Sequence, residues 1–165
     1  MIIRTATDDD WPRLYPVFAA VVADGRSYAY PQGLSAEQAR PLWMEQPPGT
    51  TVVALEGDLE GGAVLGTAKA GPNRPGRGAH VATASFMVAP GGRGRGVGRA
   101  LGEHVLGWVR GQGFRSMQFN AVVETNAPAV HLWRSLGFGV VGTVPEAFDH
   151  PDHGLVGLHV MHRPL

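Results

Sequence analysis

Residues 90–101 have the sequence PGGRGRGVGRAL, in which five of the twelve positions are glycine and three are arginine. An apolar run that reads as a strand, HVATASFMVAP, ends here, and a run with helical periodicity begins within the stretch. The glycines are therefore expected at the N-terminus of a helix, where unpaired backbone N–H groups and the positive end of the helix dipole favour an anion. The pattern predicts an anion-binding turn between a strand and a helix.

Three other uses of such a turn fit less well than a diphosphate held without a metal. A nucleotide P-loop ends in Gly-Lys-Ser/Thr, and residues 90–101 contain no lysine. A dinucleotide fingerprint needs an acidic residue about 20 positions further on, whereas the candidate Glu124 follows Gly98 by 26 residues. An RNA-binding Arg-Gly segment is usually long and disordered, whereas this one is short and lies between regular elements.

Composition excludes several classes of protein. The chain has 165 residues, 44% apolar residues and a formal net charge of zero, which predicts a single domain over 1–165 and argues against a nucleic-acid partner. The absence of cysteine excludes disulfides, thiolate metal sites and a cysteine nucleophile. No apolar run reaches the roughly 18 residues of a membrane span. We therefore expect a cytoplasmic protein with no membrane partner.

The remaining patterns predict an α/β fold with the element order βααβββαβαββ. Asp8–Asp10 are expected to cap the first helix, Ser35 and Gln38 form a capping box for the second, and DLEGG at 58–62 predicts a hairpin turn. Antiparallel strands followed by a strand–helix–strand–helix–strand unit imply a mixed, mostly antiparallel central sheet with helices on both faces. Strands are predicted at 1–7, 50–57, 63–71, 80–90, 114–123, 138–144 and 154–165, and helices at 11–23, 36–44, 97–112 and 127–136.

VAPGGRGRGVGRAL resembles the acyl-CoA signature of the GCN5-related N-acetyltransferases, Arg/Gln-x-x-Gly-x-Gly/Ala, with Arg93, Gly96 and Gly98 at its defined positions. The later stretch MQFNAVVETNAPAVHLWRSLGF is similar to the family's second signature, a strand, an Asn-capped helix and Leu-Gly-Phe. Both signatures have the family's order and separation, and the element order fits essentially the whole chain. The resemblance implies the GNAT fold with splayed strands in the middle of the sheet, and acetyl-CoA (CoA) as co-substrate with no metal.

The resemblance also assigns residues to the cofactor. In such enzymes the pyrophosphate lies on the amides of the glycine-rich loop, and the pantetheine arm fills the gap beside the splayed strand. The backbone N–H of Val88 would then point at the thioester carbonyl and stabilise the oxyanion. The cofactor residues implied in this way are Phe86, Met87, Val88, Arg93, Gly94, Arg95, Gly96, Val97, Gly98, Arg99, Asn126 and Trp133.

The implied chemistry is direct attack of a neutral amine on a thioester, which needs no nucleophilic side chain. In the family a Tyr of the second signature often protonates the leaving thiolate, but this chain has Trp133 there, and an indole nitrogen is not an acid. Water, or Tyr28 or Tyr30 from the other side, is left to supply that proton. Trp133 itself is expected either to line the acyl tunnel or to belong to the core.

Within the family, the sequence most resembles enzymes that acetylate small amines of the amino-acid type. Their substrates include azetidine-2-carboxylate, other proline analogues and phosphinothricin. It implies that Asn120 faces the substrate and that Asn126 caps a helix near the cofactor, although a cap alone would also explain Asn126. Asn120 lies in an apolar strand, where a buried amide needs partners. Thr83 stands where the subgroup has an Asn. The substrate residues are then Tyr28, Tyr30, Thr83 and Asn120, with Thr83, Asn120 and the Val88 backbone in catalytic roles.

Several alternatives stay open. A small-molecule amine is the expected acceptor. The alternatives are a protein or peptide N-acetyltransferase and a non-catalytic acyl-CoA-binding module. A homodimer is expected as a possible assembly, although the sequence does not fix the oligomeric state. The run DHPDHG at 149–154 holds two His and two Asp, but its prolines predict a surface turn rather than a metal site. Glu124 is either a base or a solvated loop carboxylate, and His80 either helps to conduct a proton or is structural.

Overall fold

The computed structural model describes residues 1–58 and 61–165, so the centre of the predicted turn at 58–62 lies outside the described residues. The described elements follow the predicted order, and the mixed α/β fold is confirmed. The strands are β1 (Ile2–Thr5), β2 (Thr50–Leu55), β3 (Val64–Pro72), β4 (Val81–Val88), β5 (Ser116–Val123), β6 (Gly139–His150) and β7 (Gly154–Pro164), and the helices are α1 (Trp11–Asp24), α2 (Ala36–Trp43), α3 (Val97–Gly111) and α4 (Ala127–Ser135).

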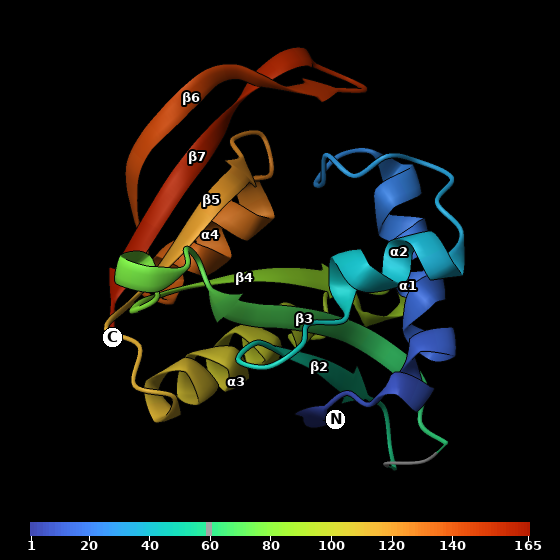
Figure 1. The fold of residues 1–165 in the computed structure, drawn as a ribbon. Coiled ribbons are helices and arrows are strands. Elements are labelled where there is room, and N and C mark those ends of the chain that lie inside the picture. The colour runs from blue at the N-terminus through green and yellow to red at the C-terminus, as the bar shows by residue number, and fades with distance from the viewer. Residues whose placement is uncertain (59–60) are drawn as a thin grey trace.

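The strands form a seven-stranded sheet in the order β1-β2-β3-β4-β5-β7-β6. All neighbours are antiparallel except β4 and β5, which run parallel and pair only at Val81 with Ser116 and at Ala82 with Met117. Beyond these two pairs the strands separate, and Figure 1 shows β5 rising away from β4. The predicted splay in the middle of the sheet is therefore present.

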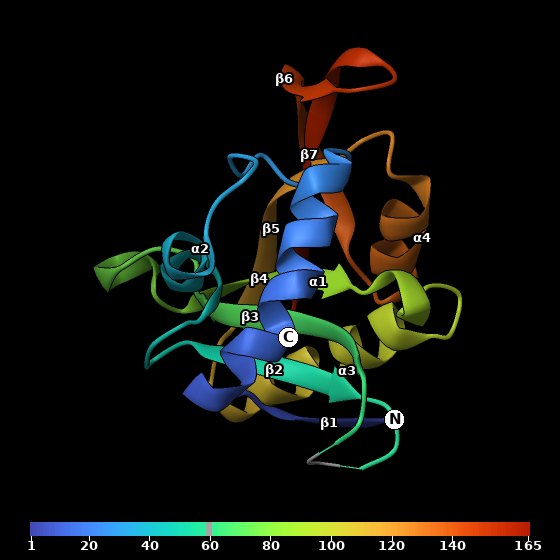
Figure 2. The same cartoon turned by 90° about the vertical axis from the view of Figure 1, so that its right-hand side faces the viewer.

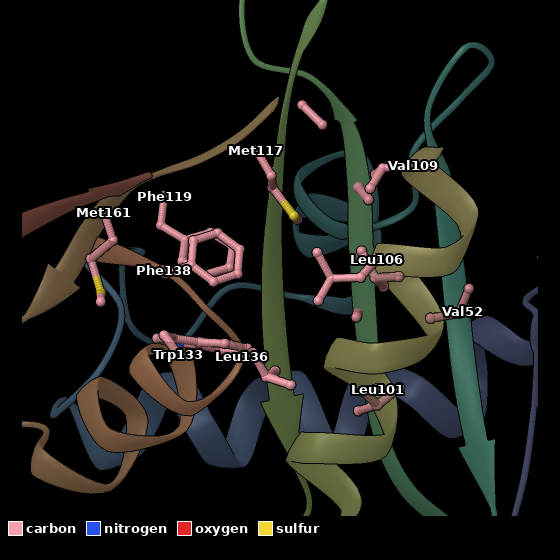
Figure 3. Close-up of a cluster of buried hydrophobic side chains, with 14 of the residues drawn as sticks. Val52, Leu101, Leu106, Val109, Met117, Phe119, Trp133, Leu136, Phe138 and Met161 are labelled. Atoms are coloured by element: carbon pink, nitrogen blue, oxygen red, sulfur yellow. The ribbon is translucent and has the colours of Figure 1, made fainter. Parts of the chain in front are cut away.

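One face of the sheet is covered by α3 and α4. Apolar residues of α3 recur at the helical period, and Leu101 and Val109 are fully buried against β2, β3 and β5. From α4 and the following turn come Trp133 and Phe138, which pack on Phe119 of β5 with ring centroids 4.8 and 4.3 Å away (Figure 3). This core holds the helix that begins at the glycine-rich turn firmly against the sheet.

The opposite face is covered by α1 and α2 (Figure 1, Figure 2). Trp43 of α2 is fully buried, and its indole N–H donates to the Thr67 hydroxyl at 3.1 Å, which itself donates to the Val52 carbonyl at 2.8 Å. The predicted capping box of Ser35 and Gln38 is present at the start of α2. These contacts fix the segment between α1 and α2, which carries the two tyrosines of the expected site.

The aspartates before α1 form a short 3-10 turn, Asp8–Asp10, that leads into the helix. Asp10 makes no side-chain cap on α1 itself, but its buried carboxylate accepts from the Thr7 N–H at 2.8 Å as the acid of a capping box on this turn. The same carboxylate accepts from both Nη atoms of Arg4, at 2.6 and 2.8 Å. Asp10 therefore caps the turn and also joins β1 to the start of α1.

The predicted strand at 138–144 is too short. β6 continues to His150 and pairs with β7 at Phe148, Asp149 and His150, after a register irregularity between Val144 and Phe148. Pro145 and the positive φ of Glu146 (51°) interrupt the alternation that would have revealed this half of the strand. Since β6 is the edge strand, such an interruption is tolerated.

Candidate functional site: a gap between two strands

The splay exposes backbone groups of β4. Ala89 N–H donates to Leu65 O at 2.9 Å, and the register with β3 continues this pairing through the alternate residues of β4. In an antiparallel pair, the intervening residues direct their N–H and C=O groups to the other side. Phe86 and Val88 therefore present these groups to the gap that β5 has left.

Tyr28 occupies one of these two positions. Its hydroxyl accepts from the Phe86 N–H at 2.9 Å and donates to the Phe86 carbonyl at 2.7 Å, in the place where a neighbouring strand would otherwise bond. The ring stacks on Tyr30 with centroids 5.6 Å apart and meets the edge of Trp43. Within the described residues, no strand neighbour faces the Val88 N–H.

The surroundings of Tyr28 bear on its expected use as an acid. Burial raises the pKa of the Tyr28 hydroxyl well above its usual range, and the hydrogen bonds at Phe86 offset this only in part. A phenol with a raised pKa gives up its proton less readily. The hydroxyl is therefore better suited to holding the Phe86 backbone than to protonating a thiolate.

The turn before α3 has the geometry of an anion cradle. Gly94 and Gly96 have φ values of 73° and 76°, in the left-handed region that glycine adopts without strain. The Ala100 N–H makes the first helical bond, to Gly96 O at 3.0 Å, so the preceding N–H groups of Val97, Gly98 and Arg99 have no acceptor within the helix. These donors, together with the bare glycines, fit a diphosphate.

The three arginines around this turn already have protein partners. Arg95 forms an ion pair with Glu56, and Arg99 donates to the Ser135 hydroxyl at 2.8 Å. The guanidinium of Arg93 lies 3.9 Å from a carboxylate oxygen of Asp24 at the end of α1. All three side chains are exposed and stand around the turn rather than inside it, so the backbone is the inner surface of the cradle.

Two residues of the second signature have clear structural partners. The Asn126 side chain accepts from the Ala129 N–H at 3.2 Å and so caps α4, as predicted, and its nitrogen is 3.5 Å from the Ser27 hydroxyl. Trp133 is only 7% exposed and packs on Phe86 with ring centroids 4.7 Å apart. Trp133 thus belongs to the core, and through Phe86 it also supports the strand that borders the gap. Its contact with a cofactor stays a prediction.

Polar side chains gather on the face of the sheet that carries α1 and α2, where β4 and β5 separate. Thr83 is half-buried there, and Asn120 is exposed, contrary to the expectation of a buried amide. The partners of Asn120 are other amides: its nitrogen donates to Asn73 Oδ1 at 2.7 Å, and its oxygen accepts from Gln118 Nε2 at 2.8 Å. Asn73 follows β3 and escaped notice in the sequence because 47 residues separate it from Asn120.

A charged contact links the two segments that stand over this face. The Arg26 guanidinium, in the segment after α1, donates to both carboxylate oxygens of Asp152 at 2.8 and 3.1 Å. Asp152 lies in the turn between β6 and β7, and Figures 1 and 2 show this hairpin and the end of α1 extending on the same side of the sheet. The contact therefore joins the segment after α1 to the turn between β6 and β7.

The remaining sequence candidates are not brought to the gap. The Glu124 carboxylate accepts a hydrogen bond from the Gly157 N–H of β7. His80 is exposed just before β4 begins. The turn of the β6–β7 hairpin is only 151–153, because Asp149 and His150 end β6 and Gly154 begins β7, so the surface turn expected over 149–154 is shorter than predicted. Among residues 1–58 and 61–165, no group of three or more His, Asp or Glu side chains is placed to hold a metal ion, and none of the helices described has the length and apolarity needed to cross a membrane.

Comparisons with known proteins agree with this arrangement. Residues 10–138 match the model of the acetyltransferase (GNAT) family. A solved GCN5-related N-acetyltransferase from Kribbella flavida is 60% identical, with a TM-score of 0.94, over 99% of this chain and 97% of that one. A phosphinothricin acetyltransferase from Sinorhizobium meliloti, solved with acetyl-CoA, is 27% identical with a TM-score of 0.86, over 99% and 88% of the two chains.

Curated relatives match over shorter stretches. N-acetyltransferase aca1 of Schizosaccharomyces pombe is 36% identical over 85 residues, which are 52% of this chain and 41% of that protein. Streptothricin acetyltransferase of Streptomyces lavendulae is 42% identical over 55 residues, 33% of this chain and 29% of that protein. The chain thus spans less than half of the length of these curated relatives.

Proposed function

The chain belongs to the acetyltransferase (GNAT) family, and we propose that it transfers an acetyl group from acetyl-CoA to the amino group of a small molecule, an amino acid or an analogue of one. Acetyl-CoA is the co-substrate, as in the solved phosphinothricin acetyltransferase that holds it. Streptothricin acetyltransferase and that enzyme are relatives whose names point to small acceptors.

The parting of β4 and β5 beside the cradle is the observation that carries this proposal. The cradle at Gly94–Arg99 offers backbone donors for the diphosphate, and the gap beyond Ala82 and Met117 offers an open strand edge for an extended arm. The open edge of β4 runs from Thr83 to Val88 and leads directly to the cradle, so a single elongated ligand can bind to both. A diphosphate joined to a pantetheine arm has this shape.

Acetyl-CoA, when bound, supplies the thioester on which the amine acts. The Val88 N–H faces the gap and donates a hydrogen bond to the thioester oxygen, where negative charge develops during attack. The Tyr28 hydroxyl forms hydrogen bonds with the N–H and the carbonyl of Phe86, and so holds the edge of β4 in place. The leaving thiolate takes its proton from water, because burial raises the pKa of Tyr28 and Trp133 carries no acidic group.

The acceptor enters from the face that carries Thr83 and Asn120. Their hydroxyl and amide orient the acceptor, whose amine attacks as the neutral base and passes its proton to water. The contact of Arg26 with Asp152 joins the segment after α1 to the β6–β7 turn. A connection between these two segments suits a small acceptor better than a folded protein or a long peptide.

A thiol-release assay with acetyl-CoA tests the proposal, using a panel of amino acids and proline analogues beside a panel of short peptides. We expect turnover with at least one amino acid and a higher kcat/KM for it than for any peptide. Turnover confined to peptides would replace the small-molecule acceptor by a peptide one. Acetyl-CoA binding by calorimetry without turnover on any amine would identify a non-catalytic acyl-CoA-binding module.

A further inference from the structure

Asn73 and Asn120 form a pair of amides that bridges across the middle strand of the splay. Asn73 lies directly after β3 and its own N–H donates to Val81 O of β4 at 2.8 Å, while Asn120 lies on β5. Their side chains meet twice: Asn120 Nδ2 donates to Asn73 Oδ1 at 2.7 Å, and Asn73 Nδ2 donates to Asn120 Oδ1 at 3.4 Å. Three strands are thus joined on the face where the acceptor is expected.

The hydrogen bonds within this group leave amide donors of the Asn73–Asn120 pair unused. Each amide nitrogen carries two N–H groups, and Asn73 and Asn120 each use one of them on the other. Gln118 likewise gives one N–H to Asn120 Oδ1, which then accepts twice. Asn120 Oδ1 is fully used and Asn73 Oδ1 accepts one bond, so the pair offers a ligand two N–H groups against one oxygen lone pair. An anion with several acceptor lone pairs matches such a surface.

The charges nearby also favour an anion. Arg74 follows Asn73 directly and its guanidinium donates to the Asn73 carbonyl at 3.0 Å. The acidic groups of the neighbouring elements are engaged elsewhere: Glu124 bonds to the Gly157 N–H of β7, and Glu45 is paired with Lys69 at 2.9 Å. An incoming carboxylate therefore meets amide donors and one arginine rather than a free carboxylate.

We propose that the Asn73–Asn120 pair recognises the carboxylate of the acceptor, so that the enzyme selects amines that also carry a carboxyl group. This inference rests on the proposed function and narrows its acceptor class. Asn73 is the specificity-determining residue, because it supplies from another strand the amide that Thr83, with its short side chain, does not provide. A site built from hydrogen-bond donors discriminates strongly against an analogue that cannot accept from all of them.

The test compares each amino acid with its carboxamide, using alanine with alaninamide, proline with prolinamide and β-alanine with β-alaninamide. The carboxamide keeps the shape but lacks the negative charge, and its amine is less basic, so kcat/KM is compared on the concentration of the neutral amine. We expect wild-type kcat/KM to favour the carboxylate by about tenfold or more, as for the loss of a charge-assisted hydrogen bond. In Asn73→Asp, a like charge faces the carboxylate, so the preference should disappear or reverse while KM for acetyl-CoA stays unchanged.

Two controls separate recognition from general damage. Gln112→Glu adds the same charge at the end of α3, on the other face of the sheet, and should leave the preference intact. Asn73→Ala removes the amide without adding charge and should reduce the preference for the carboxylate with a smaller effect on the carboxamide. Equal wild-type rates for both acceptors, or equal losses for both in Asn73→Asp, would overturn the inference.

Direct binding distinguishes failure of the inference from failure of the proposed function. Calorimetric titration of alanine, proline and β-alanine into the CoA-bound protein should detect an amino acid that binds at least about tenfold more weakly to Asn73→Asp. If no amine is acetylated but this difference is found, the proposed catalysis fails and the carboxylate site stands. If amines are acetylated without it, only the carboxylate site fails.

Discussion

The two halves of the proposed site are built in different ways. On the cofactor side, the inner surface is backbone: the N–H groups at the start of α3 and the strand edge of β4. On the acceptor side, the surface is made of side chains from separate segments, with Tyr28 from the segment after α1, Asn73 from the end of β3 and Asn120 from β5. One half is continuous in sequence, and the other is assembled from positions far apart.

This difference predicts how each half tolerates substitution. A backbone donor is changed by altering the conformation of the chain, so glycines with positive φ matter more than the charged side chains beside them. A side-chain donor is changed by replacing that side chain, even when its position in sequence looks unremarkable. Substitutions on one side should therefore affect KM for acetyl-CoA, and those on the other should affect KM for the acceptor.

The largest effect on activity is expected from Gly96→Val. Gly96 has a φ of 76° and is the N-cap of α3, a conformation that a β-branched residue adopts only with strain. We expect the apparent KM for acetyl-CoA to rise about 10- to 100-fold. Arg95→Ala, which loses the exposed contacts with Glu56 and with the Gly91 carbonyl, should change it by about twofold at most. Equal effects of both substitutions, with unchanged melting temperatures, would show that side chains hold the diphosphate.

Tyr28→Phe is expected to have a smaller effect. The substitution keeps the ring but leaves the Phe86 N–H and carbonyl without their partner, which should lower the free energy of unfolding by about 1–3 kcal/mol. We expect kcat to fall about three- to tenfold as the edge of β4 loosens. Because burial raises the pKa of Tyr28, the hydroxyl stays protonated in alkaline assays, and the pH profile of kcat should keep its shape. Loss of an alkaline limb would make Tyr28 the acid after all.

Asp152→Asn tests the contact across the acceptor side. Arg26 and Asp152 are both exposed, with 46% and 49% of their side chains accessible, so their contact is screened by solvent and salt. We expect KM for the acceptor to rise about two- to threefold at low salt, with no change in KM for acetyl-CoA. The difference from wild type should shrink as ionic strength increases. An equal rise in both KM values would show that the contact serves the cofactor side as well.

Asp10→Asn should change stability and leave both halves of the site alone. Hydrogen bonds from Arg4 lower the pKa of Asp10 to about 2. A lowered pKa stabilises the folded chain above the unfolded-state value near 4, and this contribution is lost as the pH falls from about 4 to about 2. Urea unfolding should show wild type more stable than the variant by about 2 kcal/mol at pH 7 and converging with it toward pH 2. Any change in either KM would mean that the start of α1 reaches the site.

Much of the fold could be predicted because its signals are local. The period of α3, the capping box of Ser35 with Gln38 and the Asn126 cap each depend on residues within a few positions of one another. The far half of β6 was missed because Pro145 and Glu146 break the alternation, while pairing with β7 compensates for the break. The ion pair of Asp10 with Arg4 of β1 was missed because no local pattern links these two residues.

Sequence alone determined the element order, the glycine-rich turn and the family signatures, since each of these depends on side-chain period or on backbone conformation set by neighbouring residues. Tertiary structure decided which polar groups meet: Tyr28 with the Phe86 backbone, 58 residues away, and Asn73 with Asn120, 47 residues away. No sequence pattern predicts either contact, because hydrogen bonds between distant segments form only after the sheet has brought those segments together. A short sequence motif therefore predicts the residues of the proposed cofactor half, whereas the residues of the proposed acceptor half can be identified only from the folded structure.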